Sequence, residues 1–127
     1  MHPPRHASRR FGPIAISVDA SWGRYEGGVY SPPPGGIKTT IDHAVQLVGY
    51  GHESGKDYWL VRNSWGDSWG EKGYIKLERF GEGKEPCGTD HNSQSGFGCK
   101  GDPQTIQVCG TSGMLSGSSY PTGAKKL

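Results

Sequence analysis

Residues 62–74 read RNSWGDSWGEKGY, and this stretch determines how the surrounding sequence is interpreted. Trp65 and Trp69 lie four positions apart among three glycines, directly after Asn63. Glycine disfavours helix, and the apolar residues are too few to form a buried stripe, so the pattern predicts a loop. The loop nevertheless contains two of the four tryptophans in the chain. This concentration predicts that aromatic side chains cover a polar group, and Asn63 is the candidate.

The segments on either side of this loop have the alternating pattern of β-strands. Three strands are predicted, at residues 43–50, 58–62 and 74–80. Val45 and Leu47 share one face of the first strand with His43, because side chains alternate in direction along a strand. Residues 51–56 are predicted to be the turn that joins the first two strands into a hairpin.

This hairpin predicts a contact between His43 and Asn63. A hairpin pairs the first residues of one strand with the last residues of the next, so these two side chains are expected at the same end of the sheet. The asparagine oxygen can accept the imidazole N–H, which fixes the tautomer and directs the other ring nitrogen outward. Trp65 above this bond would exclude water and strengthen it. The alternative is that His43 is a strand-end residue without chemistry and that Asn63 is a turn residue.

The outer parts of the chain extend the same architecture. Further strands are predicted at residues 14–18 and 105–108, with loops at 21–40 and 81–102. No segment has a convincing helical pattern, so the predicted fold class is mainly β, an antiparallel twisted sheet or open barrel-like domain. Residues 12–127 are predicted to form this domain, with a polar insertion at about 81–112 and an irregular leader at 1–11.

The composition restricts the class of function. A chain of 127 residues is long enough for one domain with one core. Its net charge of +2 is too weakly basic to predict binding to nucleic acid or to an anionic membrane. No apolar run approaches the length of a membrane span or of a signal-peptide core, so the sequence as written predicts neither.

The three cysteines, Cys87, Cys99 and Cys109, all lie in the polar insertion. Cysteines clustered in a loop predict a disulfide and an oxidising compartment, and an odd number leaves one thiol without a partner in the chain. Which two of them pair stays open at this level. Zinc with His91 as a fourth ligand is the alternative, but the spacing contains no C-x-x-C pair. No metal or other cofactor is therefore predicted.

Several segments resemble the papain-like family of cysteine peptidases, the family of the cathepsins. IDHAVQLVGYG followed by YWLVRNSWGDSWGEKGYIKLER is similar to the C-terminal half of that family. GPIAISVDA with YEGGVY resembles the strand and loop before the histidine, and GMLSGSSYP resembles the closing segment. The resemblance covers residues 12–79 and resumes at about residue 113. It implies the β domain of that fold, its right-hand domain, and peptide-bond hydrolysis by a thiolate–imidazolium pair.

The resemblance also implies roles for individual residues. His43 would be the imidazole of the pair, Asn63 would orient it, Trp65 would shield their bond, and Trp69 would pack beneath. The pocket for the second substrate residue before the cut would be partly lined by Ser17, Ile41 and Gly117, with Asp42 at its rim. A small residue without a carboxylate at position 117 suits a bulky apolar or aromatic substrate side chain.

The sequence departs from the family at the nucleophile. The family's cysteine lies in a C-G-S-C-W-like motif that precedes the histidine, whereas all three cysteines here follow His43. The helical domain that carries the nucleophile is expected to be absent from this chain and to be its missing partner, with a peptide or protein as the substrate. The chain alone is therefore predicted to be inactive. The location implied by the resemblance is lysosomal, vacuolar or extracellular.

A second hypothesis comes from a different class of function. The chain would then be a non-catalytic β module, derived from such a peptidase, that binds peptides or a protein partner. A binding module has no need of a His43–Asn63 pair, so the presence of both residues favours the peptidase. Upstream sequence that contains the nucleophile would discriminate between the two hypotheses.

Overall fold

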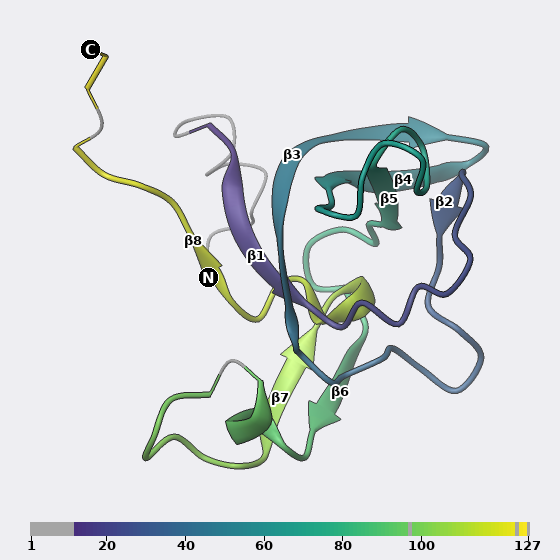
Figure 1. The fold of residues 1–127 in the computed structure, drawn as a ribbon. Coiled ribbons are helices and arrows are strands. Elements are labelled where there is room, and N and C mark those ends of the chain that lie inside the picture. Colours follow the sequence, from purple (N-terminus) through teal and green to yellow (C-terminus); the bar gives the residue numbers. More distant parts are fainter. Residues whose placement is uncertain (1–11, 97, 124, 127) are drawn as a thin grey trace.

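The computed structural model describes residues 12–96, 98–123 and 125–126 and consists mainly of strands (Figure 1). Its elements are β1 (Ile14–Val18), β2 (Val29–Tyr30), β3 (His43–Glu53), β4 (Lys56–Arg62), β5 (Tyr74–Glu78), β6 (Cys87–Asp90), the 3-10 helix η1 (Ser93–Ser95), β7 (Ile106–Cys109), the 3-10 helix η2 (Thr111–Gly113) and β8 (Ser118–Ser119). The leader expected at residues 1–11 lies outside the described residues. Within the described part of the chain, no helix has the length and apolar character needed to cross a membrane.

Six strands form one open sheet in the order β2-β5-β4-β3-β1-β8, and β6 and β7 form a separate hairpin. The hairpin lies below the larger sheet in Figure 1. The predicted mainly β fold is confirmed, and the larger sheet ends at β2 and β8 without closing into a barrel. One pair departs from the antiparallel prediction, because β2 runs parallel to β5. The loop after β1 carries the chain from the β1 side of the sheet to its opposite edge, where β2 joins β5.

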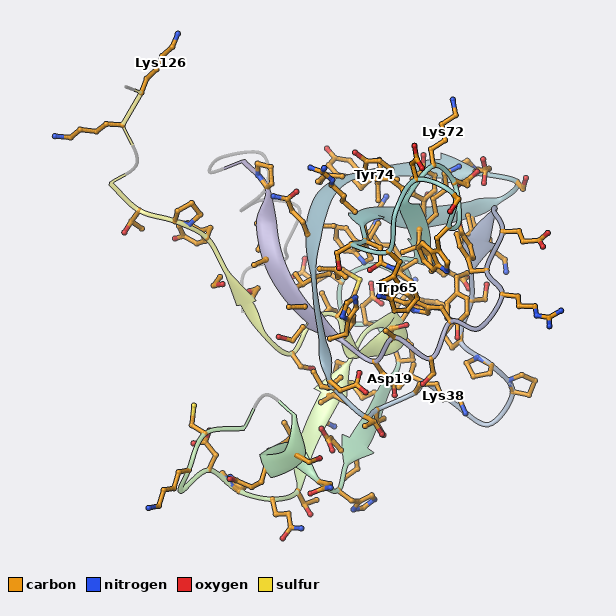
Figure 2. All side chains as sticks on the ribbon, in the orientation of Figure 1. Asp19, Lys38, Trp65, Lys72, Tyr74 and Lys126 are labelled. Atoms are coloured by element: carbon orange, nitrogen blue, oxygen red, sulfur yellow. A yellow bond between two sulfur atoms is a disulfide. The ribbon has the colours of Figure 1, made fainter. Side chains whose placement is uncertain are left out.

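The core lies on one face of this sheet, as the period-two pattern requires. In β1 the side chains of Ile14, Ile16 and Val18 are buried, whereas Ala15 between them is exposed. The other buried apolar side chains come from the neighbouring strands, the loops and η2: Trp22, Tyr25, Val45, Leu47, Trp59, Val61, Ile75, Leu77 and Met114. Past β8 the chain leads away from the sheet to Lys126 (Figure 2).

The turn between β3 and β4 is shorter than the predicted turn at 51–56. The strands continue until Glu53 pairs with Lys56, so only Ser54 and Gly55 form the turn, and both have positive φ. Positive φ at both central residues matches the right-handed twist of the flanking strands. The prediction that Gly51 belongs to the turn is wrong, because it relied on the frequency of glycine in turns. It lies in β3, where a Cβ would stand 2.5 Å from the Tyr58 hydroxyl oxygen across the ladder.

A β-bulge interrupts the ladder between β3 and β4. Leu47 pairs with Val61 on one side of it and Gly49 pairs with Leu60 on the other, so Val48 is an extra residue in β3. Because side chains alternate along a strand, this extra residue reverses which β3 side chains share a face with Val61. A hairpin with the observed Ser54–Gly55 turn and no bulge would present the opposite set.

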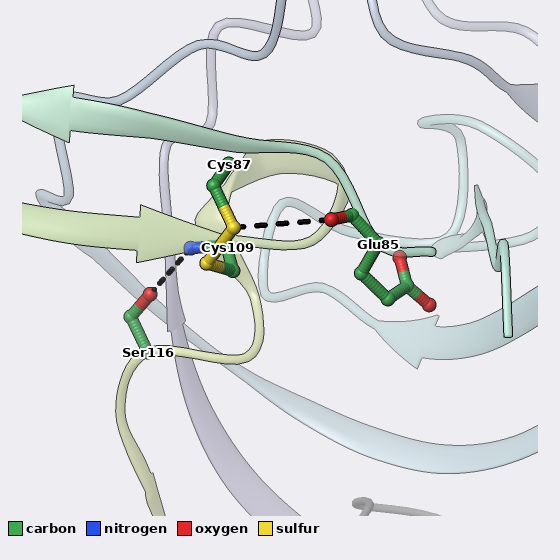
Figure 3. Close-up of a disulfide and its surroundings, with 4 residues drawn as sticks. All are labelled: Glu85, Cys87, Cys109 and Ser116. Carbon is green, nitrogen blue, oxygen red and sulfur yellow. Dashed lines mark hydrogen bonds between the residues drawn. A yellow bond between two sulfur atoms is a disulfide. The ribbon is translucent and has the colours of Figure 1, made fainter. Parts of the chain in front are cut away.

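The insertion contains a strand where a loop was predicted. Cys87–Asp90 forms β6, which pairs with β7, and the disulfide joins Cys87 to Cys109 at the base of this hairpin (Figure 3). This bridge answers the question of pairing and leaves Cys99 as an exposed free thiol. It also removes two of the three thiolates that the zinc alternative requires. A strand forms here because the disulfide holds two short polar segments in register, which local sequence does not indicate.

Glu85 lies just before β6 and provides a pH-dependent contribution to stability. Its Oε1 accepts a hydrogen bond from the backbone N–H of Phe80, and its Oε2 is buried without a partner in the described part of the chain. Burial raises the pKa of the Glu85 carboxyl, although the backbone hydrogen bond from Phe80 opposes this. The folded state therefore binds a proton at this carboxyl more tightly than the unfolded state does.

Replacing Glu85 with glutamine is expected to remove a gain in stability that the wild type has as the pH falls. With a raised folded-state pKa, the carboxyl adds stability as the pH falls from 7 through that pKa towards its ordinary value of 4.5. The Glu85→Gln variant lacks this gain, so the difference in free energy of unfolding should shift towards the wild type as the pH falls. Urea unfolding of both proteins at several pH values measures it. A difference that is constant with pH would contradict the prediction.

Candidate active site

The structure contains the hydrogen bond expected between His43 and Asn63. Nε2 of His43 lies 2.8 Å from Oδ1 of Asn63. His43 begins β3, and Asn63 follows the last residue of β4 and is buried, with 8% of its surface exposed. Continuing the register past the bulge places Asn63 opposite Val45, on the same face as His43. Without the bulge, Gln46 would lie opposite Asn63 and His43 would point to the other face.

A second hydrogen bond fixes the chemical roles in this pair. The backbone N–H of Ser64 also reaches Oδ1 of Asn63, at 2.8 Å. A backbone N–H can only donate, so the shared atom is the amide oxygen and Nε2 of His43 must carry a proton. In the neutral ring Nδ1 is then the nitrogen that can accept a proton. The pair is thus a histidine whose proton-accepting atom is set by its asparagine partner.

The glycine-rich loop at 63–74 bends back to hold Asn63. The backbone N–H of Asn63 donates to the carbonyl of Gly73 at 3.0 Å, and Gly73 donates to the carbonyl of Trp69 at 2.7 Å. Gly73 has φ of 91°, and a Cβ there would lie 3.2 Å from the carbonyl oxygen of Gly66. A side chain at position 73 would therefore be both strained and crowded. The turn that seats Asn63 requires glycine at that point.

Aromatic rings surround the pair on several sides. Trp65 stacks on His43 with ring centroids 5.3 Å apart and 28° between the planes, and Trp69 meets Trp65 edge-on at 5.0 Å. The outer side of Trp65 is open, with 45% of the residue exposed. Figure 2 shows Trp65 between Asp19, at the end of β1, and Tyr74, at the start of β5. The loop tryptophans thus cover the hydrogen-bonded pair, and one of them also faces outward.

Trp22 is central to this cluster, although it was not among the residues predicted for the site. Its ring lies 6.3 Å from that of His43 in an edge-on arrangement, 5.8 Å from Trp65 and 5.6 Å from Trp69. Trp22 is buried, with 4% exposed. A tryptophan in a glycine-containing loop was the available signal, the same signal that drew attention to Trp65.

A network of hydrogen bonds and ion pairs around Tyr25 and Lys76 supports the aromatic cluster. The Tyr25 ring is tilted against that of Trp69, with centroids 5.6 Å apart, and its hydroxyl donates to the carbonyl of Gly28 and accepts from the backbone N–H of Lys76. Burial raises the pKa of the Tyr25 hydroxyl. The Lys76 ammonium lies 2.9 Å from a carboxylate oxygen of Glu53 and 2.9 Å from one of Glu71, and hydrogen bonds to these carboxylates raise the pKa of Lys76. These contacts tie the loop after β1 to β5.

The four residues assigned to a substrate pocket occupy different environments. Ser17 and Gly117 are half-buried and lie together, because the N–H of Ser17 donates to the carbonyl of Gly117 at 3.0 Å. Asp42 is exposed, and its N–H donates to the carbonyl of Val18 at 3.1 Å. Ile41 is buried, with 1% exposed, and packs closely under Gly113 of η2. Of these four residues, Ser17, Gly117 and Asp42 are thus at least partly exposed, whereas Ile41 is not.

The cysteines of this chain form one disulfide and one free thiol in the insertion. Cys87 and Cys109 are consumed by their bridge. Cys99 lies in the insertion after η1, where its N–H donates to the Asp102 carboxylate.

Comparison with known proteins places the sequence in one family. The sequence model described as "Papain family cysteine protease" matches residues 5–97. Digestive cysteine proteinase 1 of Homarus americanus is 51% identical over 76 residues, which cover 58% of this chain and 23% of that protein. Cysteine proteinase COT44 of Brassica napus is 47% identical over 72 residues, which cover 54% of this chain and 21% of that protein. The chain thus spans less than a quarter of the length of these relatives.

Solved structures give the same result. The Carica candamarcensis cysteine protease CMS1MS2, determined in complex with E-64, aligns with a TM-score of 0.57 and 36% identity, covering 89% of this chain and 40% of that one. The digestive procathepsin L2 proteinase from Tenebrio molitor larval midgut aligns with a TM-score of 0.55 and 43% identity, covering 64% and 26% of the two chains. Both sequence identities are high enough for these structures to support the family assignment as well as the fold.

Proposed function

The chain belongs to the papain family of cysteine proteases, and on that premise we propose that it is the His/Asn-bearing C-terminal part of a cysteine endopeptidase. The observation that carries the proposal is the 2.8 Å bond between Nε2 of His43 and Oδ1 of Asn63. Because Oδ1 is identified as an acceptor by the N–H of Ser64, the bond leaves Nδ1 to exchange a proton with a thiol. The thiol belongs to a helical domain outside these 127 residues.

The chemistry proposed at this site is acyl transfer through a thioester. Nδ1 of His43 accepts the thiol proton, which produces a thiolate and an imidazolium. The thiolate attacks the scissile carbonyl carbon, and the imidazolium N–H then protonates the departing amine as the C–N bond breaks. Water hydrolyses the thioester, with His43 taking the proton from the water and returning it to the sulfur. Asn63 keeps the ring orientation constant through both steps.

The surrounding residues have supporting roles in this proposal. Trp65 shields the His43–Asn63 bond and faces the leaving-group side with its open surface, and Trp69 packs beneath it. Ser17, Gly117 and Asp42 line a pocket for the second substrate residue before the cut, and the buried Ile41 supports that pocket from within. With glycine and no carboxylate at position 117, the pocket suits a bulky apolar side chain.

The proposed location is a lysosome, a vacuole or the extracellular space. The Cys87–Cys109 disulfide supports an oxidising compartment, because such bonds persist where thiols are not kept reduced. The missing helical domain is the proposed partner.

The test of the function is to extend the reading frame upstream and express the longer product. It is expected to encode a cysteine ahead of His43, to hydrolyse a fluorogenic peptide with an apolar residue two positions from the cut, and to be inhibited by E-64. Residues 1–127 alone should show no hydrolysis above background. A stop codon close upstream, or hydrolysis by residues 1–127 alone, would contradict the proposal. The stop codon would favour the alternative, a non-catalytic peptide-binding module.

A further inference from the structure

We propose that Ser112 is a positioning residue that holds the Trp22 indole against the His43 ring and so couples η2 to the His43–Asn63 pair. The indole Nε1 of Trp22 donates to Oγ of Ser112 at 2.9 Å, and both residues are buried, with 4% and 3% exposed. The backbone N–H of Asp19 also donates to the carbonyl of Ser112 at 2.9 Å. Ser112 therefore holds the loop after β1 at two points.

The hydrogen bond to Ser112 distinguishes Trp22 from other tryptophans of the core. The indole nitrogens of Trp59 and Trp69 are buried without a partner in the part of the chain that the structure describes. Trp22 differs because its N–H has an acceptor, which sets the direction of its ring plane. That ring meets His43 edge-on and also contacts Trp65, the ring stacked on His43. A change in the orientation of Trp22 would thus affect the His43 ring directly and also through Trp65.

The backbone of Ser112 adopts a conformation that is unusual for serine. Its φ of 60° and ψ of 20° lie in the left-handed region, which favours glycine. A serine in that conformation is strained, and such strain persists where the surrounding structure holds the residue in place. Thr111 supplies part of that hold, because its hydroxyl donates to the carbonyl of Glu78 in β5 at 2.7 Å. These contacts hold Ser112 in place, so its hydroxyl has a fixed position relative to the Trp22 indole.

The inference rests on the proposed role of His43, but its test measures the ring and not hydrolysis. Ser112→Gly is the informative variant, because glycine accepts the left-handed backbone and removes only the hydroxyl. The matched control is Ser116→Gly in the same segment, which removes a different hydrogen bond, the one from the N–H of Cys109 at 3.0 Å. Inactivity of the longer product would refute the proposed function without affecting this result.

The measurements are NMR of the Trp22 indole and His43 ring nitrogens, and near-ultraviolet circular dichroism of the tryptophan cluster. In Ser112→Gly we expect the indole proton of Trp22 to exchange at least about tenfold faster and the His43 Nε2–H resonance to shift or broaden. Ser116→Gly should leave both unchanged. In a Trp22→Phe background, Ser112→Gly should change the His43 signals no further, because the hydrogen bond is already absent. Unchanged His43 signals in Ser112→Gly, or equal effects in both backgrounds, would overturn the proposal.

Discussion

Replacing His43 with alanine is expected to lower kcat/KM of the proposed full-length peptidase by about a thousandfold or more, because the thiol loses its proton acceptor and the leaving amine its proton donor. Hydrolysis of a fluorogenic peptide under conditions of low substrate measures this loss. His52→Ala is the matched control, since His52 lies in the same strand but is exposed and bonded only to Asp57 in the described structure. The control should retain nearly full activity. Equal losses in both variants would contradict the assignment of His43.

Two substitutions of Asn63 test the same site, and they are expected to lower the activity by different amounts. Asn63→Ala leaves the His43 ring without its partner, and misplacement of a catalytic group by about 1 Å costs about a hundredfold. Asn63→Asp retains an oxygen for the His43 Nε2–H and for the N–H of Ser64, and it removes an Nδ2 that has no partner among the described residues. It should therefore lose less activity than Asn63→Ala. The reverse order would show that Asn63 does not act as an acceptor.

Replacing Leu77 with alanine is expected to destabilise the domain by about 3 kcal/mol, within the range of about 2–5 kcal/mol for such core substitutions. Leu77 has no exposed surface and lies in β5 between β4 and β2. Removing the leucine side chain leaves a cavity, which the neighbouring strands could fill only by distorting the hydrogen bonds between them. Because small domains are stable by only about 5–15 kcal/mol, this loss is a large share of the total. Urea unfolding followed by circular dichroism measures it.

Leu60→Ala is the control for this stability effect. It is the same chemical change in the neighbouring strand β4, but Leu60 lies on the opposite face from Trp59 and Val61 and is only half-buried. Its expected cost is about 1 kcal/mol, in proportion to the smaller apolar area removed from contact. If the two variants unfold at the same urea concentration, the core is not on the face that the structure assigns to it.

Local pattern was sufficient to predict most strands. Ile14–Val18 forms β1 at the predicted bounds, β3 and β4 extend the predicted strands 43–50 and 58–62, and β5 ends at Glu78, two residues before the predicted end. Their alternating apolar residues carry this information because side chains on a strand point to opposite faces. The strand ends were harder to predict, since Gly51 is typical of a turn but lies in the ladder opposite Tyr58. β6 was missed because its stability comes from a disulfide to a strand distant in sequence.

The sequence by itself determined that His43 and Asn63 lie near one another at the end of a hairpin and that Trp65 follows Asn63, because these relations depend only on strand order and local spacing. Tertiary structure decided whether the two side chains meet. The extra residue at Val48 places His43 and Asn63 on the same face, and the neighbouring Gly49 is too weak a local signal to locate the bulge. Tertiary structure also brought Trp22 and Ser112, which are 90 residues apart, into hydrogen-bonding contact. Contacts of this kind depend on how the whole chain packs, so the surroundings of the pair could not be read from any single stretch of sequence.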